Sequence, residues 1–527
     1  EMASFEVGDE WGEPWGTTWF RLLGDVPSDW LRRSRPSRVE AVVDLGFTFD
    51  PPGFQAEGLV VERRDDGSIL PLHGIHPRRT HHAIADPSAP VDLLIEAASN
   101  PTFPQFAPSA QGLPETASTE PIYRFRTADL VLVDVEAEAF VHDLDVLDET
   151  MRSLPLDDPR RTKLRRSLVD ALDAVPDLAA ARSVLAPHLA SRTAEAGGRR
   201  HRIIATGHAH IDTAWLWPIR ETVRKCSRTF SSAIELMDID PEYRFTCSQA
   251  QQYAWIEERH PELFERICEK VGNGQWLPVG GMWVEADMNL PSGESLARQI
   301  IHGQRYFTEK FGAPSREVWI PDVFGYPAGL PQLFRAGGMD RFITQKLSWN
   351  KQNRFPHHTF RWEGLDGSSV LTHFPPVDTY NAEITPGEIA HSVANFKEHE
   401  WSDISLMPFG HGDGGGGPTR EMLERAHRLA EIDPDVWQKS MVDGRMVPEV
   451  LDAAIAGLGE LEWTAEDIGE LVLGLAEEFE GVNKKRAQMP VRVAITGSGV
   501  GPPLWESMVE LGREESLRRL NAARARL

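Results

Sequence analysis

Cysteines are few in this chain and long apolar runs are missing, and both absences exclude classes of protein. The 527 residues contain three cysteines, Cys226, Cys247 and Cys268, an odd number without a CxxC pair. A disulfide framework and a cysteine-bound zinc are therefore both unexpected. No run of about 18 apolar residues could span a bilayer, and no charged-then-apolar signal segment opens the chain. We predict a soluble protein of the reducing cytoplasm, with no membrane partner.

Positive charge is also scarce. Lys and Arg number 55 against 80 Asp and Glu, which gives a formal net charge of −25. This balance argues against nucleic acid or an anionic membrane as the main partner and fits a neutral or cationic substrate. The length allows two to four domains, each with its own core. The sequence is also compatible with a homo-oligomer.

The hydrophobic pattern changes three times along the chain. Residues 1–145 hold short β-type runs between turn residues and predict a small antiparallel β-sandwich. Residues 146–200 carry leucines at helical spacing and predict a helical connector that ends near the Ala-Gly-Gly-Arg-Arg of 196–200. Residues 201–430 alternate buried strands with helices and predict an α/β, β/α-barrel-like domain. Residues 431–527 predict a mostly helical tail, with a strand or turn at 491–495.

Three polar residues follow the first strand of the α/β region. His208, His210 and Asp212 alternate along an extended segment after Ile203 and Ile204, so their side chains can converge on one side. Imidazole and carboxylate are common zinc ligands, at roughly 2.0–2.2 Å from the ion. A polar turn would also contain such residues, but the position directly after a buried strand favours a metal site.

Two further segments have unusual polar or glycine-rich sequences. Asp322 ends the strand-like run 317–322, where a carboxylate can take part in chemistry or cap a following helix. The segment 409–418 includes Asp413 and then four consecutive glycines. Such glycines allow close backbone approach to a ligand, or else form a loose loop. No GK[ST] follows, so this is not a P-loop.

Together these motifs resemble glycoside hydrolase family 38, in its cytosolic and vacuolar subgroup of α-mannosidases. The resemblance covers roughly residues 1–430. The segments that carry it are His208–Trp215, Ile320–Gly325 and Gly410–Pro418, with support from Trp11–Trp15, Gln275–Asp287, Trp349–Lys351, Phe355–Phe360 and Trp362–Gly367. The resemblance implies a retaining α-mannosidase that hydrolyses terminal α-mannosides by means of a bound zinc ion.

The family also implies a role for individual residues. His210, Asp212 and Asp322 would bind one Zn²⁺, which Co²⁺ can replace at a site of nitrogen and oxygen ligands. Asp322 would also be the nucleophile. The acid/base is an aspartate in the family, with Asp378 as the best match and Asp413 as its rival. The remaining predicted substrate-binding or supporting residues are Trp215, His208, Asp287 and His411.

The tail resembles another family, the C-terminal anticodon-binding end of bacterial glutamyl-tRNA synthetases. The segments that carry this resemblance are Glu462–Glu466, Pro490–Gly497, Pro502–Met508 and Leu511–Glu514. HIGH-like and KMSKS-like motifs are absent, which excludes synthetase activity. The arginines at 518, 519, 524 and 526 could touch RNA phosphates, but a solvated helix face is the preferred interpretation. A gene fusion, an assembly error or deliberate joining would each produce the junction near 431–433.

One expected ligand is missing from the predicted site. The family requires a further zinc-binding histidine beyond the catalytic domain, whereas no histidine follows His427. We therefore expect a chain cut short before the site is complete, with weak zinc binding and impaired activity. The alternatives are an inactive fusion, an RNA-binding remnant, and another metal hydrolase with His411 as a further ligand.

Overall fold

The computed structural model of the protein divides into two compact units. One unit comprises residues 1–189 and 198–428, and the other comprises 190–197 and 429–527. The structure describes residues 3–33, 35–48, 52–64, 66–102, 117–189, 201–429, 446–479, 484–496 and 504–525. The predicted junction near 431–433 and the boundary segment 196–200 lie outside these residues.

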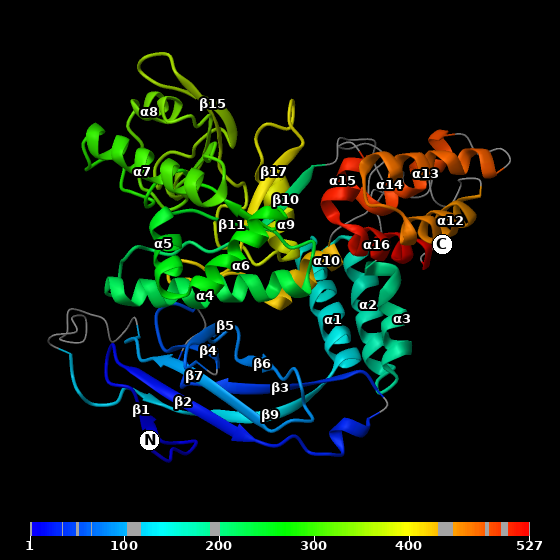
Figure 1. Cartoon of the computed structure of the whole chain (residues 1–527), viewed down its shortest axis with the longest axis horizontal. Coiled ribbons are helices and arrows are strands. Elements are labelled where there is room, and N and C mark those ends of the chain that lie inside the picture. The colour runs from blue at the N-terminus through cyan, green and yellow to red at the C-terminus, as the bar shows by residue number, and fades with distance from the viewer. Residues whose placement is uncertain are drawn as a thin grey trace. The chain divides into compact units, whose positions relative to one another are not determined.

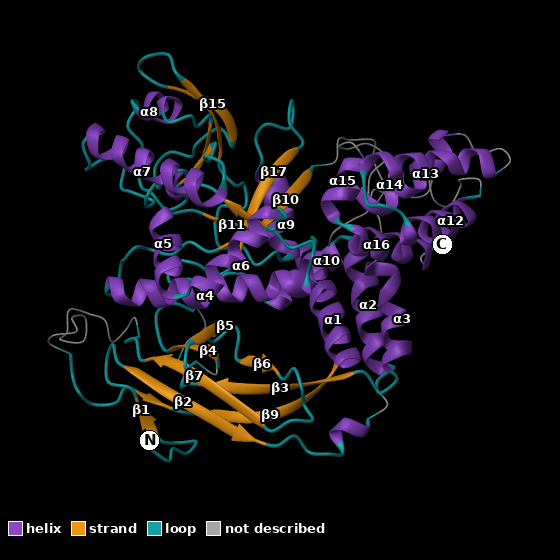
Figure 2. Ribbon diagram, in the orientation of Figure 1, coloured by secondary structure: helices purple, strands orange, loops and turns teal. Residues whose placement is uncertain are grey.

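The first unit opens with an antiparallel β-sandwich (Figure 2). Its sheets have the strand orders β2-β7-β4-β5 and β6-β3-β9, and β1 pairs with β8. Apolar residues of both sheets, such as Phe20, Val43 and Ile95, form one core, which confirms the predicted sandwich. The strands are Glu10–Trp11 (β1), Thr17–Gly24 (β2), Ser37–Asp44 (β3), Glu57–Arg63 (β4), Ile69–Ile75 (β5), His81–Ala83 (β6), Val91–Ala98 (β7), Tyr123–Arg124 (β8) and Thr127–Asp134 (β9).

Three helices follow the sandwich and pack together. They are Val135–Ser153 (α1), Pro159–Asp173 (α2) and Leu178–Leu189 (α3). The side chain of Asp134 caps α1 by accepting from the amides of Glu136 and Ala137, as an N-cap aspartate does. Leu147, Leu168 and Leu185 lie in their shared core. The helices begin at Val135, ahead of position 146, and the domain boundaries predicted from the sequence remain proposals.

The α/β domain has its strands in two four-stranded sheets. The first sheet, in the order β12-β11-β10-β17, is parallel throughout. The second, β13-β14-β16-β15, is parallel except for β15 at its edge. This arrangement confirms the predicted α/β class. The strands are Arg202–His208 (β10), Phe245–Cys247 (β11), Trp276–Pro278 (β12), Glu317–Trp319 (β13), Arg341–Ile343 (β14), Thr359–Glu363 (β15), Ser369–His373 (β16) and Ile404–Phe409 (β17).

Helices lie between these strands, and one follows the last strand. They are Ile219–Ile239 (α4), Ala250–Arg259 (α5), Pro261–Gly272 (α6), Gly293–Phe311 (α7), Leu330–Ala336 (α8), Pro386–Asn395 (α9) and Arg420–Leu429 (α10), with the short 3₁₀ helix Lys346–Trp349 (η5). Helix α4 lies between the β-sandwich and helices α5 and α6 (Figure 1). Nearly every residue of its middle part is buried, including Lys225 and Arg228. The sandwich and the α/β domain therefore share a polar contact along one helix.

The second unit is helical, as predicted for the tail. Its helices are Val447–Glu460 (α12), Ala465–Glu478 (α13), Lys484–Thr496 (α14), Leu504–Leu511 (α15) and Arg513–Ala525 (α16). The prediction of a strand or turn at 491–495 is wrong, because these residues continue α14. Val491 and Ile495 are both buried in the core of the unit. Tertiary burial here outweighs the β preference of branched side chains. Within the described residues, no helix is long and apolar enough to cross a membrane.

Candidate metal and catalytic site

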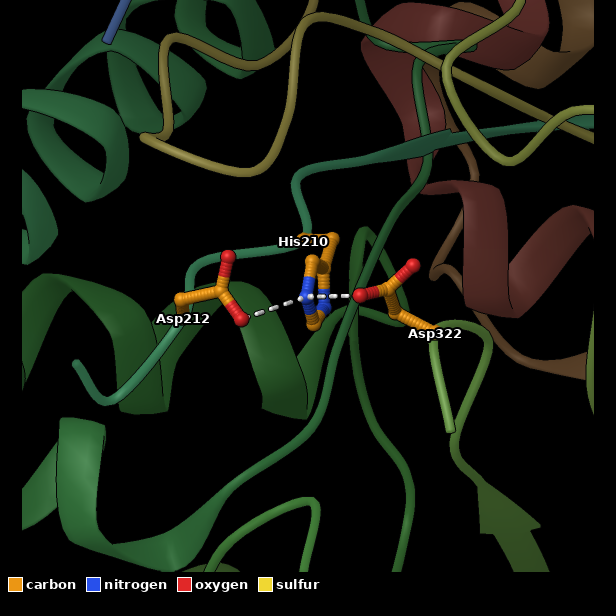
Figure 3. Close-up of side chains that lie close together, drawn as sticks. All are labelled: His210, Asp212 and Asp322. Atoms are coloured by element: carbon orange, nitrogen blue, oxygen red, sulfur yellow. Dashed lines mark ion pairs between the residues drawn. The ribbon is translucent and has the colours of Figure 1, made fainter. Parts of the chain in front are cut away.

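A cluster of one imidazole and two carboxylates lies where the two sheets of the α/β domain meet. His210 and Asp212 follow strand β10, and Asp322 follows β13. Nε2 of His210 is 3.4 Å from Oδ1 of Asp212 and 3.8 Å from Oδ2 of Asp322. Figure 3 shows the imidazole between the two carboxylates. One ligand atom from each residue lies within 4.8 Å of the others, so the three predicted ligands are brought together at a possible metal site.

The chemistry of this cluster fits a divalent cation. Both ring nitrogens of His210 are buried and make no hydrogen bond, although buried polar atoms are normally paired. Nδ1 lies at ion-pair distance, 2.9 Å, from Oε2 of the equally buried Glu285, whereas Nε2 faces Asp212 and Asp322. Burial lowers the pKa of His210, but the carboxylates of Glu285 and Asp212 outweigh burial and hold that pKa well above its usual value. The pocket therefore favours positive charge, with Nε2 as the nitrogen available to a metal.

A tyrosine connects this cluster to a further carboxylate. The hydroxyl of Tyr380 lies 2.6 Å from Oδ1 of Asp322 and 2.7 Å from Oδ1 of Asp413. Burial raises the pKa of Asp413, and the nearby charges of Asp322 and Asp212 act in the same direction, against His210 and Tyr380. Lys346, also buried, pairs with Oδ1 of Asp322. The cluster thus holds two carboxylates in contrasting surroundings: Asp322 is paired with a cation, and Asp413 has a raised pKa.

The backbone holds Asp413 beside the predicted ligands. Its carbonyl accepts from the amide of Asp212 at 2.9 Å, and its φ is +62°. The four glycines that follow are in close contact with protein. A Cβ on Gly414 would lie 2.4 Å from Cα of Gly53, and a Cβ on Gly415 would lie 2.6 Å from Oγ1 of Thr229. Close backbone approach therefore explains Gly414, where the approaching backbone belongs to the loop before β4 of the sandwich, whereas at Gly415 the approaching group is the side chain of Thr229 on α4.

The other predicted carboxylates lie in different surroundings. Asp378 accepts from His391 and Asn395 of α9, each at 3.0 Å. The structure thus pairs Asp378 with a helix, whereas its rival Asp413 shares Tyr380 with Asp322. Asp287 is exposed, and its Oδ1 accepts from two backbone amides of its own turn. That turn occupies one of its carboxylate oxygens.

The remaining predicted residues divide between core and surface. His208 is fully buried, with Nδ1 at 3.1 Å from the carbonyl of Thr246 and Nε2 accepting from Trp319 at 3.4 Å. Burial lowers the pKa of His208 to about 3, so it is a neutral core residue. Trp215 keeps 56% of its surface exposed. The ring of His411 lies 6.1 Å from that of His76, at the end of β5.

Three residues of the cluster were not predicted from the sequence. Glu285 stands two positions before Asp287, in the segment Gln275–Asp287, which supports the family resemblance but predicts no role for this residue. Tyr380 stands two positions after Asp378, the aspartate that was preferred. Lys346 lies in η5 with no motif around it. A rule that pairs each predicted histidine ligand with a second carboxylate would have drawn attention to Glu285, whereas nothing local marks Lys346.

Three domain families match this chain. Residues 200–443 match the glycosyl hydrolases family 38 N-terminal domain. Residues 1–131 match the α-mannosidase jelly roll domain, and residues 420–524 match the anticodon binding domain.

Individual relatives agree with these matches. The chain is 40% identical over 439 residues to α-mannosidase 2C1 of Homo sapiens, covering 81% of this chain and 40% of that protein. It is 38% identical over 450 residues to the α-mannosidase of Saccharomyces cerevisiae, covering 82% of this chain and 40% of that protein. Its last part is 44% identical over 97 residues to glutamate–tRNA ligase of Salinispora arenicola, covering 18% of this chain and 20% of that protein.

The chain thus spans about 40% of the length of these α-mannosidases. Both predicted resemblances are confirmed: residues 1–131 and 200–443 group with the α-mannosidases of glycosyl hydrolase family 38, and the C-terminal part groups with an anticodon-binding domain and with glutamate–tRNA ligases.

Proposed function

We propose that the first unit is the catalytic part of a zinc-dependent, retaining α-mannosidase. One observation carries the proposal. Within a single cluster, His210, Asp212 and Asp322 offer three ligand atoms to a cation, and Asp322 shares the Tyr380 hydroxyl with Asp413. A retaining glycosidase needs this combination of an ionised nucleophile and a neighbouring acid. The similarity to α-mannosidases over 81% of the chain supports the substrate class.

The proposed ion is one Zn²⁺, held by Nε2 of His210 and by the carboxylates of Asp212 and Asp322. Co²⁺ fits the same donors. When bound, the ion supplies a Lewis acid that can hold two adjacent sugar hydroxyls. Three protein ligands leave coordination positions for substrate, as in other catalytic zinc sites. Glu285 fixes the orientation of the His210 ring by binding its other nitrogen.

Asp322 is the proposed nucleophile. Its carboxylate pairs with the ammonium group of Lys346 and accepts from Tyr380, and these two contacts hold it in place beside the proposed ion. In the first step an oxygen of Asp322 would form a bond to the anomeric carbon as the bond from that carbon to the leaving oxygen breaks. Water would then release the sugar from Asp322 in the second step.

Asp413 is the proposed acid/base, on the basis of a proton count. One hydroxyl cannot donate to two carboxylates at once. Because the Tyr380 oxygen lies within 2.7 Å of both carboxyl groups, one of them is best satisfied as a neutral acid that donates to it. The raised pKa of Asp413 favours that residue.

The test measures zinc content and hydrolysis of an aryl α-mannoside, for this chain and for Asp322→Asn. We expect weak zinc binding and low turnover in the wild type, which offers three protein ligands, and turnover lost in the variant. Zinc bound without turnover, or turnover that survives the substitution, would contradict the proposal.

Other functions receive less support. An amidohydrolase of the HxH type would use His208 as a ligand, but Thr246 and Trp319 occupy both of its nitrogens.

In the tail, Arg519 donates to the carbonyl of Ile495 and Arg524 pairs with Asp452. Because these two of the four predicted arginines bind the tail itself, we propose that it does not bind tRNA, which a gel-shift assay with tRNA would test. Arg526 lies outside the residues that the structure describes. Three free cysteines support a reducing, cytoplasmic location.

A further inference from the structure

The loop that leads into strand β4 of the sandwich lies against the candidate site. We propose that residues 52–55 form a positioning loop of the active site, in which Gly53 fixes the glycine segment after Asp413 and Phe54 supports Trp215. This inference deepens the proposed function and rests on it for its catalytic readout. It assigns a part in the reaction to the N-terminal sandwich, which contributes no residue to the metal and acid cluster described above.

The contact of Gly53 is made by backbone alone. Its φ is +95°, and a Cβ at this position would lie 2.7 Å from Cα of Gly414. A Cβ on Gly414 would in turn meet Gly53 at 2.4 Å. No other residue fits at either position, so the two segments touch at a fixed separation. Since Gly414 directly follows Asp413, this contact limits where the carboxyl group of Asp413 can lie.

A second contact fixes the same glycine segment from helix α4. The amide of Gly416 donates to Oγ1 of Thr229 at 3.0 Å. Pro52 lies on the other side, where a Cβ on Gly416 would meet its ring at 3.2 Å. The segment is therefore held between α4 and the positioning loop. A loose glycine run would not place an acid reproducibly, whereas a clamped run does.

Phe54 makes the second proposed contribution. Its ring meets Trp215 edge-on with centroids 5.7 Å apart, and it lies 5.8 Å from Trp217. Trp217 is buried and donates to Oγ1 of Thr222 on α4 at 3.0 Å. Phe54 thus fills the space between a fixed indole and the exposed indole of Trp215. A supported Trp215 loses less side-chain entropy when a sugar ring stacks on it.

The loop is itself anchored to the catalytic domain. The ammonium group of Lys225 donates to the carbonyl of Gly53 and to Oε1 of Glu57, both at 2.8 Å. The side chain of Lys225 is fully buried, and its charge lies 4.6 Å from the centre of the Trp217 ring. A buried cation shared by loop, strand and aromatic ring gives the loop one position relative to α4.

An ordinary domain contact would stabilise the fold without affecting the reaction, so the test must separate the two. The matched pair is Gly53→Ala and Gly67→Ala. Gly67 also has a positive φ, +86°, but nothing lies within 4 Å of its Cβ position. Both changes strain the backbone, and only the first disturbs the glycine segment. Phe54→Leu is the third variant, because it keeps an apolar side chain and removes the ring.

Each variant is assayed with an aryl α-mannoside, and its amide hydrogen exchange is followed over residues 411–417. We expect Gly53→Ala to lower kcat by about ten- to a hundredfold, because small misplacement of a reacting group is costly, and to speed exchange in that segment. Phe54→Leu should raise KM more than it lowers kcat. Zinc content should not change, and Gly67→Ala should match wild type in kcat, KM and exchange.

Two results would overturn the proposal: Gly53→Ala with wild-type kcat and exchange, or equal losses in Gly53→Ala and Gly67→Ala. The exchange measurement does not depend on turnover. If the wild type binds zinc but does not hydrolyse mannosides, the proposed function fails, while altered exchange in Gly53→Ala still supports the positioning of the segment. If the wild type is active and Gly53→Ala is unaffected, only the positioning loop is refuted.

Discussion

Glu285 and His210 form a buried pair in which Oε2 of the carboxylate lies 2.9 Å from Nδ1 of the ring. Such a partner fixes which nitrogen faces the metal and raises its basicity. We therefore predict that Glu285→Gln weakens zinc binding by about 10- to 100-fold, measured by competition with a chelator.

The control for this prediction is Asp287→Asn, two positions further on. Asp287 is exposed and binds backbone amides of its own turn. Its substitution should leave zinc affinity close to that of the wild type. Equal zinc affinity in the Glu285 variant and the wild type would refute the pairing role.

Substrates with different leaving groups can decide whether Asp413 or Asp378 is the acid/base. Asp413→Asn should reduce kcat by about a hundred- to ten-thousandfold for an alkyl mannoside, whose leaving group needs a proton. Hydrolysis of a dinitrophenyl mannoside, whose leaving group departs without a proton, should lose much less of its kcat. Asp378→Asn should show no such dependence on the leaving group, since its carboxylate is paired with α9. The reverse pattern would assign the role to Asp378.

The buried charges between the sandwich and α4 predict a stability effect. Glu57 accepts from Lys225 at 2.8 Å and pairs with Arg228. Glu57→Gln leaves the ammonium group of Lys225 buried without its counter-charge. We expect a loss of about 3–5 kcal/mol in the free energy of unfolding, measured by urea denaturation. Glu10→Gln, which breaks the exposed pair with Arg124, should cost far less, and equal losses would contradict this account.

His427 on α10 predicts a dependence of stability on pH. Its Nε2 lies 2.7 Å from Oδ2 of Asp240, which follows α4. This hydrogen bond raises the pKa of His427 above its usual 6.5. The stabilisation that protonated His427 provides is therefore complete below pH 6.5 and is lost as the pH rises through the raised pKa of His427 in the folded protein. For Asp240, burial raises the pKa, but the hydrogen bond and charge of His427 and the backbone amides of Glu242 and Tyr243 together outweigh burial and lower it below 3.8.

The measurement is the melting temperature of the wild type and of His427→Gln across this range. The wild type should melt higher than the variant between pH 3.8 and 6.5, where both groups are charged. The difference should shrink at alkaline pH. A difference that does not change with pH would mean that charge plays no part in the contact.

Much of this architecture could be predicted from local patterns. The metal ligands after β10 could be predicted because an extended segment places alternate residues on one side. Asp322 could be predicted because it follows a buried strand. The helix at 491–495 was missed because its branched residues prefer strands in isolation, and only packing against the rest of the tail decides otherwise. Lys346 and Tyr380 were missed because they reach Asp322 from distant parts of the chain, and a single sequence does not report such contacts.

The placement of the three metal ligands has a mechanical consequence. His210 and Asp212 extend from the sheet that contains β10, whereas Asp322 extends from the sheet that contains β13. An ion held by all three would be a cross-link between the two halves of the α/β domain. Its binding free energy would then add to the stability of the assembled domain. Removal of the ion by a chelator would weaken the contact between the two sheets as well as remove the catalytic ion. The affinity for zinc would then measure how firmly the two halves of the domain are held together.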